Sequence, residues 1–421
     1  FDPVKAATKV ISQQTLASVG IGPIAAVDVV SYSVSAPGYR TPVSVRFTST
    51  SGTTKTLSGS QARTLFGLSF VWWEAPVALT AAYVPLGLTR IADTRANLGL
   101  APAAGLHREV MLPATVSPSA RAVALTITIT RPSAPGSIYV YSKGAEKPAV
   151  TLQYGAGETK AVFTIVHLVA SKVIVVDSTS SVDVILDVSG MFVDAQNSSS
   201  GRVVSVDQVR AFDSRSTAGY TKAAGTTVTV ALPATIPASA SAVWVNVTVT
   251  RPTAKGFLVV YPAGSPRPAT SSTNVDTVQQ TRATLLLIPV SSSGVSVFMS
   301  MPTDVILDVV GYVTGSSAPA SSAGLLKVGH PAQQPQPYVL PAQQTSNLVV
   351  PPTGVWFGSV TGTCQQPGFL TLWSHGSQPS TSSLNMTAVT ATNTVLLNTS
   401  TPTKAFTSCA TTISLYSTAA F

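Results

Sequence analysis

The chain is poor in charged residues. Asp, Glu, Lys and Arg make up 10% of its 421 residues, whereas globular proteins contain about 25%. The net charge of +9 comes from Lys and Arg residues that are scattered along the sequence rather than clustered. Nucleic-acid-binding proteins usually gather basic residues on one face. The sequence therefore argues against nucleic acid as a partner and is compatible with loose attraction to an anionic surface.

Residues that catalyse reactions or bind metals are also scarce. The four histidines do not have metal-ligand spacing, and no HExxH, GxSxG, GxGxxG or Walker-type motif is present. Glutamate occurs four times, and a glycosidase needs two carboxylates on one cleft. Asp93 with Asp187 is the pair that the sequence leaves open for such a role. We expect no enzymatic activity, no metal and no cofactor.

Long apolar runs are missing and cysteine is rare. No stretch of about 18 apolar residues exists, so we expect no membrane span. Cys364 and Cys409 lie in Ser/Thr-rich sequence, and we interpret them as one disulfide of an exported protein. Two unrelated buried thiols are the alternative. The chain begins with Phe1, which favours a processed product, and we expect an extracellular, cell-surface location.

A phrase of strand, turn and strand occurs twice. LTITITRPSAPGSIYVY (125–141) and VNVTVTRPTAKGFLVVY (245–261) match at eight positions with an offset of 120. Each copy later ends in a similar strand, VDVILDVSGMF (182–192) or TDVILDVVGYV (303–313). Short strands with Pro, Gly and Ser between them are typical of a β-sandwich or jelly roll. In LTITIT the apolar residues alternate with threonines, which we expect on the outward face.

A third, degenerate copy follows, in which residues 367–397 align with residues 255–287. It carries the cysteine pair in place of the opening and closing motifs, as an atypical last unit of an array would. The fold prediction is all-β: tandem β-sandwich or jelly-roll-like repeats after a small N-terminal α+β unit. The predicted domains are a small α+β domain at 1–80, repeat 1 at 81–195, repeat 2 at 196–324, and a disulfide-capped repeat 3 at 325–421.

Charged residues recur at matching positions of the first two copies. RIADTR (90–95) and RAFDSR (210–215) open them with the same Arg, Asp and Arg spacing. One interpretation is a repeated polar site for a sugar or an ion. We favour structural ion pairs, because a partly buried carboxylate needs a partner to tolerate burial. The recurring set is Asp93, Arg95, Arg131 and Asp187 in the first copy, and Asp213, Arg215, Arg251 and Asp308 in the second.

The repeats resemble β-modules of secreted, cell-wall-associated proteins of actinobacteria. RIADTR, VNVTVTRPTAKGFLVVY, PATSSTN and LDVVGYV match the motifs of those modules in order, over about residues 88–313 and more faintly to 421. Such modules accompany several enzymes, so the resemblance implies a module type and a location rather than an activity.

Residues 43–74 resemble the β-hairpin and short helix of the sporulation protein D family of peptidoglycan enzymes. The resemblance rests on the sequence VSVRFTSTSGTTKTLSGSQARTLFGLSFVWWE. The family's catalytic glutamate lies in a Glu-Met-Pro type segment and a Gly-His-Gly motif lies downstream, and this chain contains neither. The resemblance therefore implies a non-catalytic fragment.

Together these features predict a non-enzymatic extracellular structural or adhesive protein of the cell surface. We expect it to self-associate into a homo-oligomer, fibre, sheath or surface layer, since neighbouring subunits can cover an apolar, Ser/Thr-rich surface. The alternative is an array that binds cell-wall glycan or peptidoglycan and belongs to a wall hydrolase. Peptidoglycan hydrolysis by the chain itself is a third hypothesis, which the missing motifs disfavour.

Overall fold

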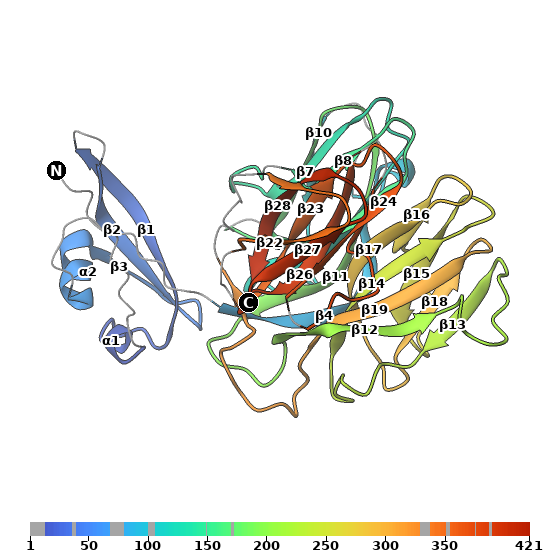
Figure 1. Cartoon of the computed structure of the whole chain (residues 1–421). Coiled ribbons are helices and arrows are strands. Elements are labelled where there is room, and N and C mark those ends of the chain that lie inside the picture. Colours follow the sequence, from blue (N-terminus) through green and yellow to red (C-terminus); the bar gives the residue numbers. More distant parts are fainter. Residues whose placement is uncertain are drawn as a thin grey trace. The chain divides into compact units, whose positions relative to one another are not determined.

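The computed structural model describes residues 13–35, 39–67, 80–99, 106–148, 150–169, 172–328, 337–350, 354–374, 376–386 and 390–421. The chain divides into two units, Phe1–Leu79 and Thr80–Phe421, which we call the N-terminal and C-terminal units. Figure 1 shows their elements.

The N-terminal unit is a small α+β fold. A three-stranded antiparallel sheet has the order β1-β2-β3, and β3 runs directly into helix α2. Ser58 and Gln61 form a capping box at the start of α2, and Gly67 ends it with a left-handed φ of 58°. Residues 68–74, the end of the segment that resembles the sporulation family, lie outside the described residues. The elements are α1 (Gln13–Ala17), β1 (Ile24–Ser35), β2 (Tyr39–Ser49), β3 (Thr54–Ser58) and α2 (Gly59–Phe66).

The described residues of the C-terminal unit form three β-sandwiches of eight strands each, which we call repeats 1 to 3. Repeat 1 comprises β4 (Thr80–Asp93), β5 (His107–Met111), β6 (Ala120–Thr130), β7 (Gly136–Ser142), β8 (Leu152–Tyr154), β9 (Lys160–His167), β10 (Val173–Ser178) and β11 (Asp183–Asp194), with the short helix η1 (Thr94–Ala96). Repeat 2 comprises β12 (Val203–Asp213), β13 (Thr226–Val230), β14 (Ala242–Thr250), β15 (Gly256–Pro262), β16 (Thr273–Val275), β17 (Arg282–Pro289), β18 (Val295–Met299) and β19 (Asp304–Val313). Repeat 3 comprises β21 (Tyr338–Leu340), β22 (Gln344–Leu348), β23 (Val355–Gly362), β24 (Gly368–Trp373), β25 (Leu384–Met386), β26 (Ala391–Asn398), β27 (Thr403–Thr407) and β28 (Thr411–Ala420).

All three repeats have the same strand order. The first, eighth, third and sixth strands form one sheet, which we call the axial sheet, and the second, seventh, fourth and fifth form the other, the outer sheet. Two four-stranded antiparallel sheets connected in this way make a jelly roll. The all-β, tandem-repeat prediction is confirmed. A short extra strand, β20 (Leu326–Lys327), pairs with β4 at the edge of the repeat 1 axial sheet.

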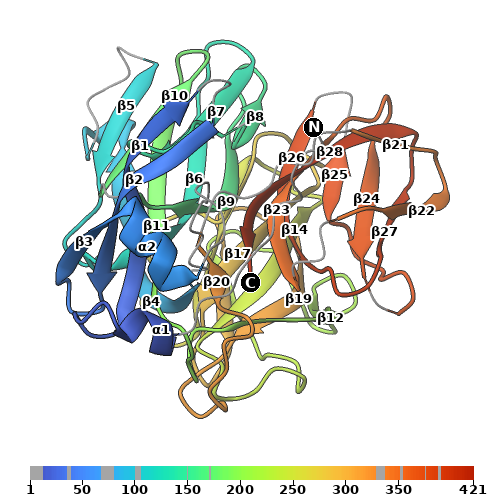
Figure 2. The ribbon, with the colours of Figure 1, turned by 90° about the vertical axis from the view of Figure 1, so that its left-hand side faces the viewer.

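The three axial sheets pack against one another. Their sixth strands, β9, β17 and β26, contact each other in all three pairs, and they lie together in Figure 2. The rings of Phe163 on β9, Trp244 on β14 and Phe357 on β23 form a triangle with one ring from each repeat. Their centroids are 5.5 Å apart for Phe163 and Trp244, 5.2 Å for Trp244 and Phe357, and 5.7 Å for Phe163 and Phe357. The repeats are therefore arranged as a threefold-like cluster within one chain.

This packing corrects one sequence prediction. Thr126, Thr128 and Thr130, expected on an outward face, are 7%, 2% and 9% exposed. In repeat 2 every residue of β14 is buried, because one side lines the sandwich core and the other faces the neighbouring repeats. Uncharged threonines suit both a solvated and a buried sheet face, so the sequence pattern could not distinguish the two.

The segment between β11 and β12 and the segment between β19 and β20 are joined by backbone hydrogen bonds. The backbones of Ser198 and Ser321 bond each other in both directions at 3.1 and 3.0 Å. The N–H of Gly201 donates to the carbonyl of Thr314 at 2.9 Å. The chain thus runs past the segment between β11 and β12, and β20 pairs with β4 before the chain enters repeat 3.

Candidate functional site

The first charged cluster of repeats 1 and 2 joins the start of η1, or its counterpart in repeat 2, to the eighth strand. In repeat 1, Arg90 binds Asp187 (Nε–Oδ1, 2.9 Å) and Asp93 (Nη1–Oδ2, 3.2 Å). Arg95 binds Asp93 through Nη2 at 2.7 Å and through Nε at 2.9 Å. The two carboxylates left open as a glycosidase pair are 4% and 2% exposed and share Arg90, so they do not face a cleft as free acids.

Repeat 2 reproduces this cluster. Arg210 binds Asp308 at 2.6 Å and Asp213 at 2.8 Å, and Arg215 binds Asp213 at 2.6 Å. Hydrogen bonds from Arg215 lower the pKa of Asp213 to about 2. Burial raises the pKa of Asp308 to about 6, although Arg210 opposes the rise. The pKa values of the two neighbouring carboxylates differ because Asp213 is bound by the guanidinium groups of Arg210 and Arg215, whereas Asp308 is more deeply buried.

The carboxylates of repeat 1 differ in the same sense. The side-chain hydrogen bond from Arg95 lowers the pKa of Asp93. Burial raises the pKa of Asp187, again against the effect of Arg90. The repetition of the same geometry and the same pKa directions in two repeats points to a shared role in holding the strand ends.

The second cluster fixes the turn after the third strand. Arg131 pairs with Asp183 at 2.6 Å, and Thr94 donates to the other oxygen of Asp183 at 2.9 Å. Arg131 has a left-handed φ of 53°, which is uncommon outside glycine and places its guanidinium against the eighth strand. Sequence reasoning named Arg131 and missed Asp183. The signal was available, because the first Asp of the DVILDV strand recurs at an offset of 121.

Repeat 2 carries the same second cluster with one addition. Arg251, with φ 51°, pairs with Asp304 at 2.6 Å, and Ser214 replaces the threonine at 3.0 Å. Lys222 also binds Asp304. Burial alone would raise the pKa of Asp304, but the bonds from Lys222, Ser214 and Arg251 outweigh burial and lower it.

Repeat 3 places the cysteines where repeats 1 and 2 place the second cluster. Cys364 and Cys409 form a disulfide between the turn after β23 and the connection from β27 to β28. In the other repeats the Arg131–Asp183 and Arg251–Asp304 ion pairs join the corresponding turn to the start of the eighth strand. The disulfide therefore makes a covalent link at the same end of the sandwich.

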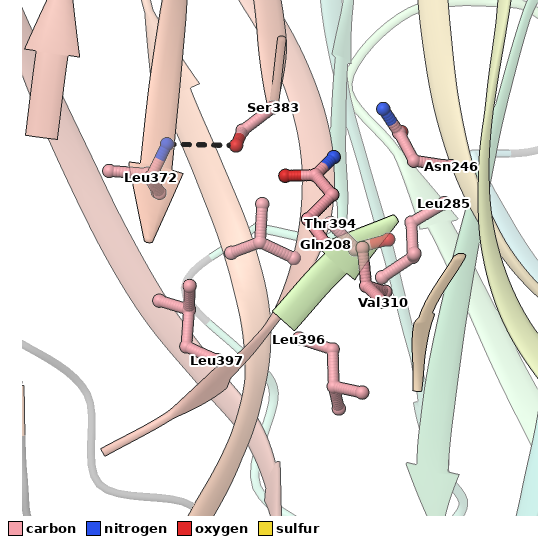
Figure 3. A pocket seen from close by; sticks show the side chains of 10 residues that line it. Gln208, Asn246, Leu285, Val310, Leu372, Ser383, Thr394, Leu396 and Leu397 are labelled. Atoms are coloured by element: carbon pink, nitrogen blue, oxygen red, sulfur yellow. Dashed lines mark hydrogen bonds between the residues drawn. The ribbon is translucent and has the colours of Figure 1, made fainter. Parts of the chain in front are cut away.

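A small cavity lies between repeats 2 and 3 (Figure 3). Its volume of about 30 Å³ holds one or two water molecules, far below the several hundred Å³ of typical ligand pockets. Asn246 beside it donates to the carbonyl of Ser382 at 2.8 Å, and the N–H of Leu372 donates to Ser383 Oγ at 3.0 Å. Within the described ranges, no group of three or more His, Cys, Asp or Glu residues is placed to hold a metal ion.

The boundary between repeats 1 and 2 contains a further charged group. Arg282 on β17 binds Glu158 of repeat 1 at 2.8 Å and lies 3.6 Å from Asp276. Lys160 on β9 is 5% exposed and donates to the carbonyl of Gln153 at 3.0 Å, and its burial lowers its pKa to about 8. Sequence reasoning did not identify this group, because Arg282 and Glu158 come from different repeats, although Lys160 and Arg282 hold equivalent positions at the start of the sixth strand.

The histidines are dispersed. His107 binds Asp177 on the outer sheet of repeat 1 at 2.7 Å, and His167 contacts the carbonyl of Thr418 in repeat 3 at 3.0 Å. His330 and His375 lie outside the described residues. In the part of the chain that the structure describes, no helix is long and apolar enough to span a membrane.

Comparison with known proteins yields no family. No family model and no curated protein matches the chain. Among solved structures, a Parabacteroides distasonis protein described provisionally as secreted has a TM-score of 0.11 and 5% sequence identity, over 60% of this chain and 88% of that chain. A similarity at this level carries no argument about function.

Proposed function

We propose that the chain is a non-enzymatic structural or adhesive protein of the cell surface that is exported and self-associates. The Cys364–Cys409 disulfide supports export, because such bonds persist mainly in oxidising compartments. The recurring charged positions support a structural role, because their carboxylates bind arginines of the same repeat. The interlocked axial sheets support a rigid building unit.

Self-association requires a different surface from the Ser/Thr-rich one that the sequence predicted. The threonine-rich strand faces are covered by the other repeats of the same chain rather than by neighbouring subunits. The outer sheets of repeats 2 and 3 remain in part, because Leu88 of repeat 1 packs on Val259, Tyr261 and Phe298 of the repeat 2 sheet. Both sheets keep an exposed aromatic residue at the same position. Phe257 on β15 and Phe369 on β24 hold the same position and are each 37% exposed. Each ring lies beside a second phenylalanine, Phe298 at 6.2 Å or Phe406 at 6.0 Å.

These paired patches are the observation that carries the proposal. A copy with two equivalent apolar patches can bind two neighbours, and contacts of this kind extend into chains when they do not close into a ring. The large exposed aromatic side chains also supply the apolar area that protein interfaces bury at their centres.

Light scattering and electron microscopy of the purified full chain test this proposal. We expect concentration-dependent assembly of the native chain, and less assembly for the double variant Phe257→Ser/Phe369→Ser. Val339→Ser, which removes an apolar side chain that is 78% exposed elsewhere in repeat 3, is the matched control and should assemble normally. A chain that stays monomeric at high concentration contradicts the proposal, as does a double variant that assembles like the control.

A further inference from the structure

The outer sheet of repeat 1 gathers polar and aromatic side chains on its exposed face. His107 and Glu109 come from β5, Tyr139 and Tyr141 from β7, and Asp177 from β10. Register places them on one face, since Asp177 pairs with both His107 and Tyr139, while Val175 pairs with both Glu109 and Tyr141. Lys143 follows β7 directly, and Lys147 lies four residues further along the chain. We call these seven residues the repeat 1 outer face.

Asp177 is the centre of this face. Its Oδ1 contacts His107 Nδ1 at 2.7 Å, and its Oδ2 accepts from Tyr141 Oη at 2.8 Å and from Lys147 Nζ at 3.0 Å. The Lys147 ammonium also lies 4.1 Å from the centre of the Tyr139 ring. Burial alone would raise the pKa of Asp177, but the bonds from Lys147, Tyr141 and His107 lower it. Its carboxylate is thus held ionised at the base of an exposed polar surface.

Donors and acceptors alternate toward the edge of the face. Lys143 Nζ donates to Glu109 at 2.8 Å, and His107 lies 3.7 Å from the same carboxylate. The side chains of His107, Lys143 and Lys147 are 61%, 55% and 47% exposed. Two carboxylates therefore stand among three nitrogen groups, which leaves the face nearly balanced in charge and accessible to solvent.

The jelly roll does not need these side chains. At the position equivalent to Asp177, repeat 2 has Phe298 and repeat 3 has Phe406. The residue that pairs with this position from the second strand is His107 in repeat 1 and a threonine in repeats 2 and 3. Both repeats build the same four-stranded outer sheet with the same strand order. A chain with 10% charged residues therefore concentrates charge on one of three equivalent faces without a requirement from the fold. Exposed polar and aromatic residues that the scaffold does not need are candidates for binding.

We propose that the repeat 1 outer face binds a polysaccharide. A sugar ring presents apolar C–H faces that pack on tyrosine rings, and hydroxyl groups that both donate and accept hydrogen bonds. The carboxylates of Asp177 and Glu109 accept such bonds, and Lys143, Lys147 and His107 supply donors. A nearly charge-balanced face favours an uncharged, hydroxyl-rich polymer over a strongly anionic one. An open sheet surface also suits a long chain, which needs no enclosed pocket.

This inference goes beyond the proposed self-association, because it uses a different repeat and a different surface. The experiment is co-sedimentation of the full chain with three insoluble polysaccharides: chitin, cellulose and purified peptidoglycan. We expect retention on at least one of them. The double variant Tyr139→Ser/Lys147→Ser should reduce that retention at least tenfold, and Asp177→Asn, which keeps the shape of the side chain, should also reduce it.

Phe257→Ser is the matched control, since it removes an exposed aromatic from the corresponding sheet face of repeat 2. It should leave polysaccharide retention unchanged, whereas the repeat 1 variants should leave self-association unchanged. Circular dichroism melting of each variant establishes that it is folded. No retention of the native chain on any of the three polymers overturns the inference, and so does equal retention of the native chain and the folded repeat 1 variants.

Discussion

The backbone N–H of Leu285 donates a hydrogen bond to the side-chain oxygen of Asn393, 3.2 Å away in the next repeat. Leu285 belongs to β17, an edge strand of its sheet, and its N–H would otherwise lack a ladder partner. The amide nitrogen of Asn393 donates to the carbonyl of Ser383 at 2.8 Å. The buried side chain of Asn393 thus accepts a bond from an edge N–H of repeat 2 and donates a bond to a backbone carbonyl of repeat 3. The edge of one sheet is therefore hydrogen-bonded across the boundary between the repeats.

Replacement of Asn393 tests this coupling. We expect Asn393→Ala to lower the free energy of unfolding by about 1–3 kcal/mol, because the variant leaves a buried N–H and a buried carbonyl without their partner. Urea denaturation followed by intrinsic fluorescence measures the change. Asn347→Ala removes an exposed asparagine from the same repeat and should cost less than about 0.5 kcal/mol. Equal losses for the two variants would contradict the coupling.

The disulfide of repeat 3 should contribute measurably to stability. Cys364 and Cys409 are 45 residues apart, and a crosslink of this span stabilises by about 4 kcal/mol in the chain-entropy model. We expect Cys364→Ala/Cys409→Ala to lower the melting temperature of the C-terminal unit. Dithiothreitol should lower the melting temperature of the native chain and leave that of the variant unchanged. A native chain that is insensitive to the reductant contradicts the prediction.

Asp308 should make the protein less stable as the pH rises from about 4 to 6. Burial raises its pKa from 3.8 to about 6, so the folded state binds a proton that the unfolded state has released across this window. The lost stability amounts to at most about 3 kcal/mol. Asp308→Asn should remove this contribution, so its stability should fall less, or rise more, than that of the native chain between these pH values. Parallel pH profiles for the variant and the native chain would contradict the assignment.

The control for this profile is Asp207→Asn, an exposed aspartate of the same repeat. Asp213 acts in a different window. Its folded pKa of about 2 lies below the unfolded value of 3.8, so its contribution is present above pH 4 and is lost as the pH falls through 2. Measurements restricted to pH 4–6 therefore isolate Asp308 from Asp213.

The buried Lys160 should cost stability at neutral pH. Its pKa falls from 10.5 to about 8 because the ammonium is desolvated, so the penalty is present below pH 8 and is relieved as the pH rises toward 10.5. We expect the stability of Lys160→Met relative to the native chain to be about 3 kcal/mol more favourable at pH 7 than above pH 10. Lys255→Met, at an exposed position, should show no such trend. A relative stability of Lys160→Met that does not change with pH would rule out the buried charge.

The sequence was sufficient for the repeats but not for their packing. The offset of 120 and the strand alternation predicted tandem sandwiches, and the recurring Arg131 and Asp187 are both in ion pairs. The strand pattern does not distinguish a buried Thr126 from a solvent-exposed one, because an uncharged β-former suits either environment. Asn393 and Arg282 were missed for a related reason, since each makes its contact across a repeat boundary. Lys160 is basic at the position equivalent to Arg282, but this recurrence does not reveal the partner Glu158 in another repeat.

The repeat 1 outer face was missed because its residues are far apart in the sequence. His107 and Asp177 meet only through the pairing of β5 with β10, and neither belongs to a recurring motif. A comparison of the three repeats position by position, rather than a search for what they share, would have identified Asp177 as the residue that departs from phenylalanine.

Hydrogen–deuterium exchange of β9, β17 and β26 tests the central claim, that the three repeats meet through their sixth strands. All three are edge strands of their axial sheets, apart from the contacts they make with each other. We predict that their amides, including that of Leu285, exchange as slowly as those of the central strand β14. Exchange as fast as that of the short outer edge strands β8 and β25 would mean that the repeats are independent domains, and would contradict the account.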